Sequence, residues 1–109
     1  MQKLGMQRRS KRLPLSIPVR IDGRTANNRP FRYVTETRAV SVHGALLTVD
    51  AKVKRGQTVL LVNAITDKER ACRVAYVEPR LWGKRKIGLE FANDSGDFWH
   101  VYPSLIRSK

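Results

Sequence analysis

The sequence predicts an all-β domain of about six short strands followed by a small terminal helix. Segments in which apolar and polar residues alternate recur at short intervals, and turns rich in glycine, asparagine and charged residues separate them. The chain has 109 residues, which is enough for one modest hydrophobic core. Strands this short and this evenly spaced are typical of a barrel or a sandwich, because an open sheet would leave long unpaired edges.

The first strand is expected at Leu13–Ile21, where apolar residues occupy every second position. Pro14 and Pro18 have no backbone N–H, so this strand is expected at a sheet edge or beside a bulge. The polar segment Asp22–Pro30 is expected to be a loop. The other strands are expected at Phe31–Val42, Ala45–Val49, Thr58–Ile65, Arg70–Val77 and Ile87–Phe91.

The last part of the chain changes from a strand pattern to a helical one. Asn93–Ser95 supplies residues that favour a helix start, and an apolar stripe with Phe98, Trp99 and Tyr102 follows. Pro103 limits the helix to one or two turns. We expect this helix to cover an open end of the barrel with Phe98 and Trp99.

The charge of the chain is strongly positive and unevenly distributed. It has 22 Lys and Arg against 9 Asp and Glu, a net charge of +13. Residues 1–35 hold nine of the cations and one acid, Asp22. This asymmetry predicts an anionic partner, and a nucleotide, a nucleic acid and an acidic protein all fit it.

Cysteine content and hydropathy predict a soluble protein of the cytoplasm. Cys72 is the only cysteine, which excludes an internal disulfide and fits a reducing compartment. Arginines follow Met1–Gly5 where a signal peptide would have an apolar stretch. The longest apolar run, Val59–Val62, is too short to cross a bilayer.

Residues 1–12 are polar, basic and without periodicity, so they are expected to form a flexible arm ahead of a single domain at 13–109. Arg8, Arg9 and Arg12 lie within this arm. A guanidinium presents a planar fork of donors that fits phosphate oxygens and the acceptor edge of guanine. Farther along, Ser41 and Gly44 offer a hydroxyl and exposed backbone within a strand pattern, and a planar ligand could lie against them.

These residues make the chain similar to the PilZ domain, a bacterial receptor module for cyclic diguanylate. Arg8 and Arg12 match the family's Arg-x-x-x-Arg arm, and Ser41 and Gly44 match its Asp/Asn-x-Ser-x-x-Gly segment. Ile87–Phe91 resembles the family's last barrel strand, and the resemblance extends from about Arg8 to Tyr102. It implies a six-stranded antiparallel barrel with a C-terminal helix. It also implies that the ligand lies on the outer face beneath the arm. The ligand-binding candidates are therefore Arg8, Arg9, Arg12, Ser41 and Gly44, with Arg38 and His43 as accessory candidates.

The chain departs from the second signature at Ala39, which stands where the family has Asp or Asn. A methyl group cannot accept a hydrogen bond from guanine, and losing one such bond costs on the order of 1–3 kcal/mol, or roughly 10- to 200-fold in affinity. Alternation along a strand places Arg38 on the opposite face, while Ser41 shares the face of Ala39. His43 shares it only if the strand stays regular as far as the glycine. Two alternatives follow: a receptor of weakened affinity, or a degenerate domain that acts as a ligand-independent adaptor for an acidic protein surface.

The sequence does not predict an enzyme, a metal site or a bound cofactor, so cyclic diguanylate would be a regulatory ligand. His43 and His100 are the only histidines, and no nucleophile is paired with a base. Trp82 lies in a basic loop with Arg80 and Lys84, where it could stack on a base or simply cover the barrel edge. A basic barrel that binds nucleic acid is therefore the third alternative.

Overall fold

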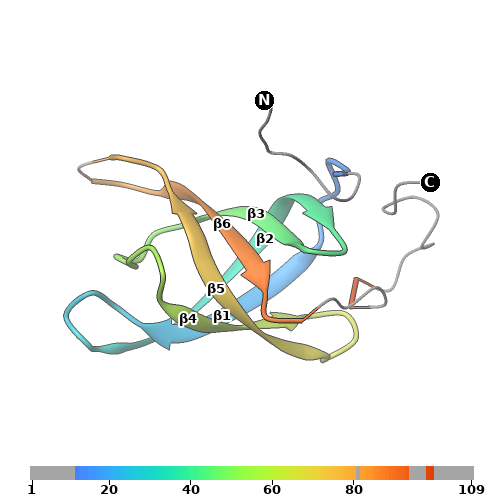
Figure 1. The fold of residues 1–109 in the computed structure, drawn as a ribbon, viewed down its shortest axis with the longest axis horizontal. Helices are drawn as coiled ribbons and strands as arrows, with labels where there is room; N and C mark the ends of the chain where they lie inside the picture. The colour runs from blue at the N-terminus through green and yellow to red at the C-terminus, as the bar shows by residue number, and fades with distance from the viewer. Residues whose placement is uncertain (1–11, 81, 94–97, 100–109) are drawn as a thin grey trace.

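The computed structural model describes residues 12–80, 82–93 and 98–99 of the chain. Six antiparallel strands close into a barrel in the order β1-β2-β3-β6-β5-β4 (Figure 1). The strands are β1 Pro18–Arg24, β2 Pro30–Ser41, β3 Gly44–Val49, β4 Thr58–Asn63, β5 Glu69–Val77 and β6 Arg85–Phe91. The expected all-β, six-stranded antiparallel barrel is confirmed, and the sandwich alternative is wrong because β1 pairs with both β2 and β4 and so closes the sheet.

The interior of the barrel is filled by the apolar residues that alternate along each strand. Val19, Leu47, Leu61 and Val74 are fully buried and come from four different strands. Complete closure removes the unpaired edges that a six-stranded open sheet would carry. The alternation read from the sequence therefore describes the core correctly wherever a strand is regular.

The first strand begins later than the sequence predicts, at Pro18 instead of Leu13. Leu13 forms an isolated bridge to Val40, in which each residue's N–H donates to the other's carbonyl at 2.9 Å. Between bridge and strand, the Thr37 hydroxyl donates to the Leu15 carbonyl at 2.6 Å and accepts from Ile17 N–H at 2.9 Å. The prolines interrupt the backbone ladder here, and a threonine side chain satisfies groups that the ladder leaves unpaired.

Two β-bulges change which residues face the interior. The pairing of β2 with β3 shifts between Thr37 and Ala39, so Arg38 is the extra residue. The pairing of β5 with β6 shifts between Val74 and Tyr76. Tyr76 continues the alternation of the buried Val74 in the sequence, yet it is 48% exposed. A strictly regular pattern is therefore wrong at both positions.

The segment from Ser41 to Gly44 is a hairpin rather than a continuous strand. β2 ends at Ser41, Val42 and His43 form the turn, and β3 begins at Gly44, which pairs directly with Ser41. The expectation that the second strand runs through Val42 is wrong, and a face for His43 cannot be assigned from strand alternation.

The expected C-terminal helix is not found among the described residues. Phe98 and Trp99 form a turn, and the rest of the predicted helix after Asn93 lies outside the described residues. The packing expected of this segment is nevertheless present. Phe98 and Trp99 are buried, and their rings lie 5.2 and 5.9 Å from the ring of Phe91. Asn63 Nδ2 also donates to the Phe98 carbonyl at 2.9 Å, so these two aromatic residues cover one end of the barrel.

Within the described residues, no helix has the length and apolar character needed to span a membrane.

Candidate ligand-binding pocket

A pocket of about 510 Å³ lies on the outer surface of the barrel, over the end of β2, over β3 and β6, and over the bulged part of β5. The sequence candidates Arg12, Ser41, His43 and Gly44 all line it, as does Ala39. Residues that are about thirty positions apart in the sequence thus meet at one site. Arg8 and Arg9 lie outside the described residues.

Arg12 reaches the pocket because the chain is fixed immediately after it. The two hydrogen bonds between Leu13 and Val40 place the root of the arm beside the β2 residues on either side of Val40. Leu13 also packs against the core, while Arg12 itself is exposed. The bridge therefore holds an exposed guanidinium over the signature segment of β2.

The floor of the pocket consists of outward-facing residues in two rows across the strands. One row contains Ser41, Gly44 and Glu90, which are successive partners on β2, β3 and β6. The second row runs from Ala39 through Leu46 and Gly88 to Tyr76. Neighbouring strands are about 4.8 Å apart, so this second row spans roughly 14 Å, which is wide enough for a planar base and its sugar.

Ser41 is held tightly by the turn and by the C-terminal aromatic residues. Its Oγ accepts a hydrogen bond from His43 N–H at 3.1 Å, and its carbonyl accepts one from Trp99 Nε1 at 2.8 Å. A serine hydroxyl that accepts one bond still has its own hydrogen to donate. The side chain is buried except for 8% of its surface, so this donor is preorganised at the edge of the pocket.

Gly44 is required by the barrel itself. A Cβ at this position would lie 1.9 Å from the Leu89 carbonyl oxygen and 2.9 Å from the Leu89 carbonyl carbon. No side chain fits at that distance from the backbone of β6, so the glycine of the second signature has a structural reason that does not involve a ligand.

Arg38 lies away from this pocket. As the extra residue of the bulge it is exposed and lines a separate shallow depression together with Ser16, Tyr33 and Glu36. The expectation from the sequence that Arg38 and Ala39 point in different directions agrees with this arrangement, although its cause is a bulge and not simple alternation.

Of the lining residues that were not predicted from the sequence, three have polar or charged side chains: Tyr76, Lys86 and Glu90. Tyr76 faces outward only because of the β5 bulge, and its partner Gly88 has no side chain to cover the ring. Glu90 is paired with Arg73, which neutralises its charge at the pocket edge. Gly88, the glycine inside the final strand, was the one signal in the sequence that a neighbouring side chain packs closely against that strand.

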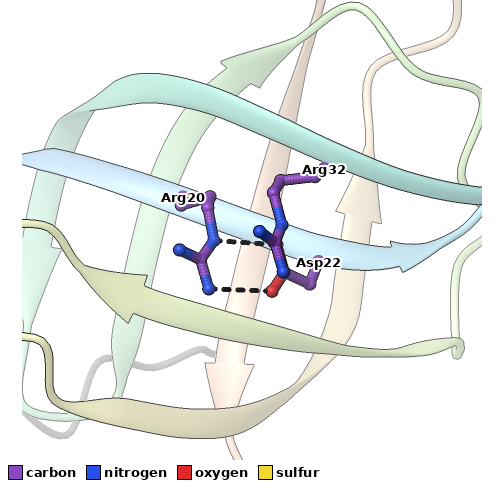
Figure 2. Close-up of polar contacts among 3 residues, drawn as sticks. All are labelled: Arg20, Asp22 and Arg32. Carbon is purple, nitrogen blue, oxygen red and sulfur yellow. Dashed lines mark hydrogen bonds and ion pairs between the residues drawn. The ribbon is translucent and has the colours of Figure 1, made fainter.

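A second group of charged residues lies on the outer face of β1 and β2. The Arg20 guanidinium contacts Asp22 through two hydrogen bonds of 3.0 Å, and Arg32 Nε lies 3.3 Å from the same carboxylate (Figure 2). The hydrogen bond to Asp22 raises the pKa of Arg20. These residues do not line the pocket, and Asp22 compensates part of the positive charge of the two arginines.

The thiol of Cys72 faces the barrel interior and does not line the pocket. Cys72 is 1% exposed on the interior side of β5, and burial raises the pKa of its thiol to about 12. A thiol with that pKa stays protonated and is a poor nucleophile. Among the described residues, no three His, Cys, Asp or Glu side chains are grouped as a metal site.

The fold and the pocket define a closed antiparallel barrel whose outer face carries a partly apolar, partly basic site of nucleotide size. The chain matches the family model of the PilZ domain over residues 6–99. It therefore belongs to the PilZ domain family. No curated protein and no solved structure matches it significantly.

Proposed function

We propose that this PilZ domain is a receptor for cyclic diguanylate and that the ligand lies in the pocket over β2, β3 and β6. The observation that carries the proposal is the convergence of both family signatures, through Arg12, Ser41 and Gly44, on one surface. The family match makes this ligand class the first candidate.

The chemistry of the lining residues suits such a ligand. Arg12 and Lys86 supply positive charge for the two phosphates, and the Ser41 hydroxyl supplies a fixed donor. The outward ring of Tyr76 offers a face on which a guanine could stack. Arg8 and Arg9, in the arm ahead of the Leu13 bridge, would add contacts from above.

Ala39 determines how strong the binding is. The bulge at Arg38 directs residue 39 into the pocket, where an Asp or Asn would accept hydrogen bonds from guanine. Glu90 is the one carboxylate that lines the pocket among the described residues, and it lies in the neighbouring row two strands away from β2. Glu90 therefore cannot replace the missing acceptor at the same point, and we expect affinity about 10- to 200-fold below that of an otherwise equal site.

The test is titration calorimetry with cyclic diguanylate on the wild type and three variants. Arg12→Ala should weaken binding by at least tenfold, because it removes a charge-assisted contact of about 1.5–3 kcal/mol. Arg38→Ala is the matched control, since it removes an arginine nearby that lines the other depression. Ala39→Asn should tighten binding. Absence of heat at high micromolar ligand, or equal losses in both arginine variants, would refute the receptor assignment.

The alternative is a ligand-independent adaptor that binds an acidic protein surface. Ala39 is the observation that favours it, because it removes the one side-chain acceptor of the second signature. A partner captured equally well with and without cyclic diguanylate, and equally by Ser41→Ala, would support the adaptor. In either case we propose a binding module of the bacterial cytoplasm without catalytic activity or bound cofactor.

A further inference from the structure

Three loops of the barrel gather at the end opposite the β2–β3 and β4–β5 turns. Because all neighbouring strands are antiparallel, the β1–β2 turn (25–29), the β3–β4 loop (50–57) and the β5–β6 loop (78–84) share one end, on the left of Figure 1. Ala26 N–H donates to the Lys52 carbonyl at 2.7 Å, and Gln57 Nε2 donates to the Arg24 carbonyl. These bonds join the first two loops into one surface. We call the three loops together with Arg24 the basic end.

The basic end is far more strongly charged than the opposite end of the described barrel. Its described residues include seven cations and two acids, whereas the turns 42–43 and 64–68 at the other end hold one lysine and one aspartate. All seven cations are exposed. They are Arg24, Arg29, Lys52, Lys54, Arg55, Arg80 and Lys84.

The positive charge of the basic end is not compensated within the described structure. None of its seven cations forms an ion pair with another described residue. On the neighbouring face of β1 and β2, by contrast, Arg20 and Arg32 share the carboxylate of Asp22 (Figure 2). The charge at the loops is therefore available to an external anionic surface.

An exposed tryptophan lies within this charged surface. Trp82 is 77% exposed in the β5–β6 loop, between Arg80 and Lys84, and Gly83 beside it has a positive φ of 81°. The alternative that Trp82 covers the barrel edge is wrong, because most of its surface is free. An indole combines a large apolar surface with one N–H donor, which is the combination enriched at the interface between lipid and water.

We propose that the basic end docks on the surface of an anionic lipid bilayer, with Trp82 among the headgroups and the loop cations against lipid phosphates. Cations near such a surface each strengthen binding about fivefold. A bilayer is favoured over single-stranded nucleic acid because the latter is bound in grooves that present several aromatic faces. Trp82 is the only exposed aromatic residue among the described residues of these loops. The docking surface is separate from the pocket, and it stands or falls independently of cyclic diguanylate binding.

The chain carries its own probe for this interaction. Trp99, the second tryptophan, is 2% exposed and hydrogen-bonded to Ser41, so its emission should not respond to lipid. Vesicles of phosphatidylcholine mixed with phosphatidylglycerol should shift the Trp82 emission to shorter wavelength, whereas vesicles of phosphatidylcholine alone should not. The shift should disappear in Trp82→Phe, and added salt should weaken it.

Co-sedimentation with the same vesicles separates the loops from the rest of the barrel. The double variant Lys52→Gln/Lys54→Gln should bind about 30-fold more weakly. The double variant Lys68→Gln/Arg70→Gln removes the same charge at the opposite end of the barrel, near the β4–β5 turn, and should lose at most a few-fold. Trp82→Ala should also weaken binding to these vesicles. Its control is Ile65→Ala, which removes an apolar side chain that is 67% exposed at the other end of the barrel and should bind like the wild type. Equal losses in the paired variants, no binding to anionic vesicles, or Trp82-dependent binding to oligonucleotides without binding to vesicles would overturn the proposal.

Discussion

Replacing Gly44 by alanine tests whether this signature glycine is kept for the barrel or for the ligand. The new Cβ would lie 1.9 Å from the Leu89 carbonyl oxygen, where an ordinary contact is at least 3.4 Å. The obstructing atom belongs to the backbone of β6, so no side-chain rotation relieves the contact. We expect Gly44→Ala to push β3 and β6 apart at the pairs Gly44 with Glu90 and Ala45 with Leu89.

The cost follows from the two effects combined. Forcing a methyl group into a closely packed position costs about 1–3 kcal/mol. Weakening one or two ladder hydrogen bonds adds about 1 kcal/mol each. The sum of about 2–5 kcal/mol is a large part of the 5–15 kcal/mol that stabilises a typical domain.

Urea unfolding without ligand measures this loss directly. Gly88→Ala is the matched control on the same floor, because its Cβ would meet the Tyr76 Cβ at 3.3 Å, a contact that a small shift relieves. We expect Gly44→Ala to lower the urea midpoint far more than Gly88→Ala. A Gly44→Ala protein as stable as the wild type that fails to bind cyclic diguanylate would refute the structural explanation and make this glycine a ligand determinant.

Two further predictions concern buried groups. Trp99→Phe leaves the Ser41 carbonyl without its 2.8 Å donor. The free energy of unfolding should therefore fall by about 1–3 kcal/mol, and any ligand binding at Ser41 should weaken. An unchanged denaturation midpoint would contradict the coupling of these two residues. The pKa of the Cys72 thiol is about 12 in the folded protein and 9.0 when the thiol is exposed, so the unfolded chain loses this proton first as the pH rises. The free energy of unfolding should therefore fall by up to about 1.4 kcal/mol per pH unit above pH 9. Cys72→Ala should lack that part of the pH dependence in urea titrations between pH 8 and about 11, whereas parallel pH profiles of variant and wild type would contradict it.

The regular parts of the barrel could be predicted from the sequence because burial on one face imposes a period of two. Positions such as Val19, Leu47 and Leu61 follow that rule and form the core. The start of β1 could not be placed, since Pro14 and Pro18 permit either an edge strand or the observed bridge at Leu13. A bridge to Val40 depends on a partner 27 positions away in the sequence, which local patterns do not contain.

The candidate site residues were chosen from residue identities, and the directions of their side chains could not be predicted from periodicity alone, because two β-bulges interrupt the period. Alternation alone places Ala39 on the face of Ser41, but the bulge at Arg38 breaks the period just before it, so Thr37 is buried while Ala39 lines the outer pocket. The bulge between Val74 and Tyr76 turns an aromatic ring outward that a regular strand would bury. A bulge costs a strand one ladder position, and nothing in a single sequence shows which residue is left unpaired.

The bulge also explains why loss of the signature acceptor at Ala39 leaves the fold intact. The direction of residue 39 is set by backbone pairing with Leu46 and by the bridge between Leu13 and the following Val40, and neither involves the side chain. Gly44, by contrast, could not change without displacing β6. The two positions of one signature therefore tolerate substitution differently: the glycine is fixed by packing, while the backbone that holds position 39 requires no particular side chain there.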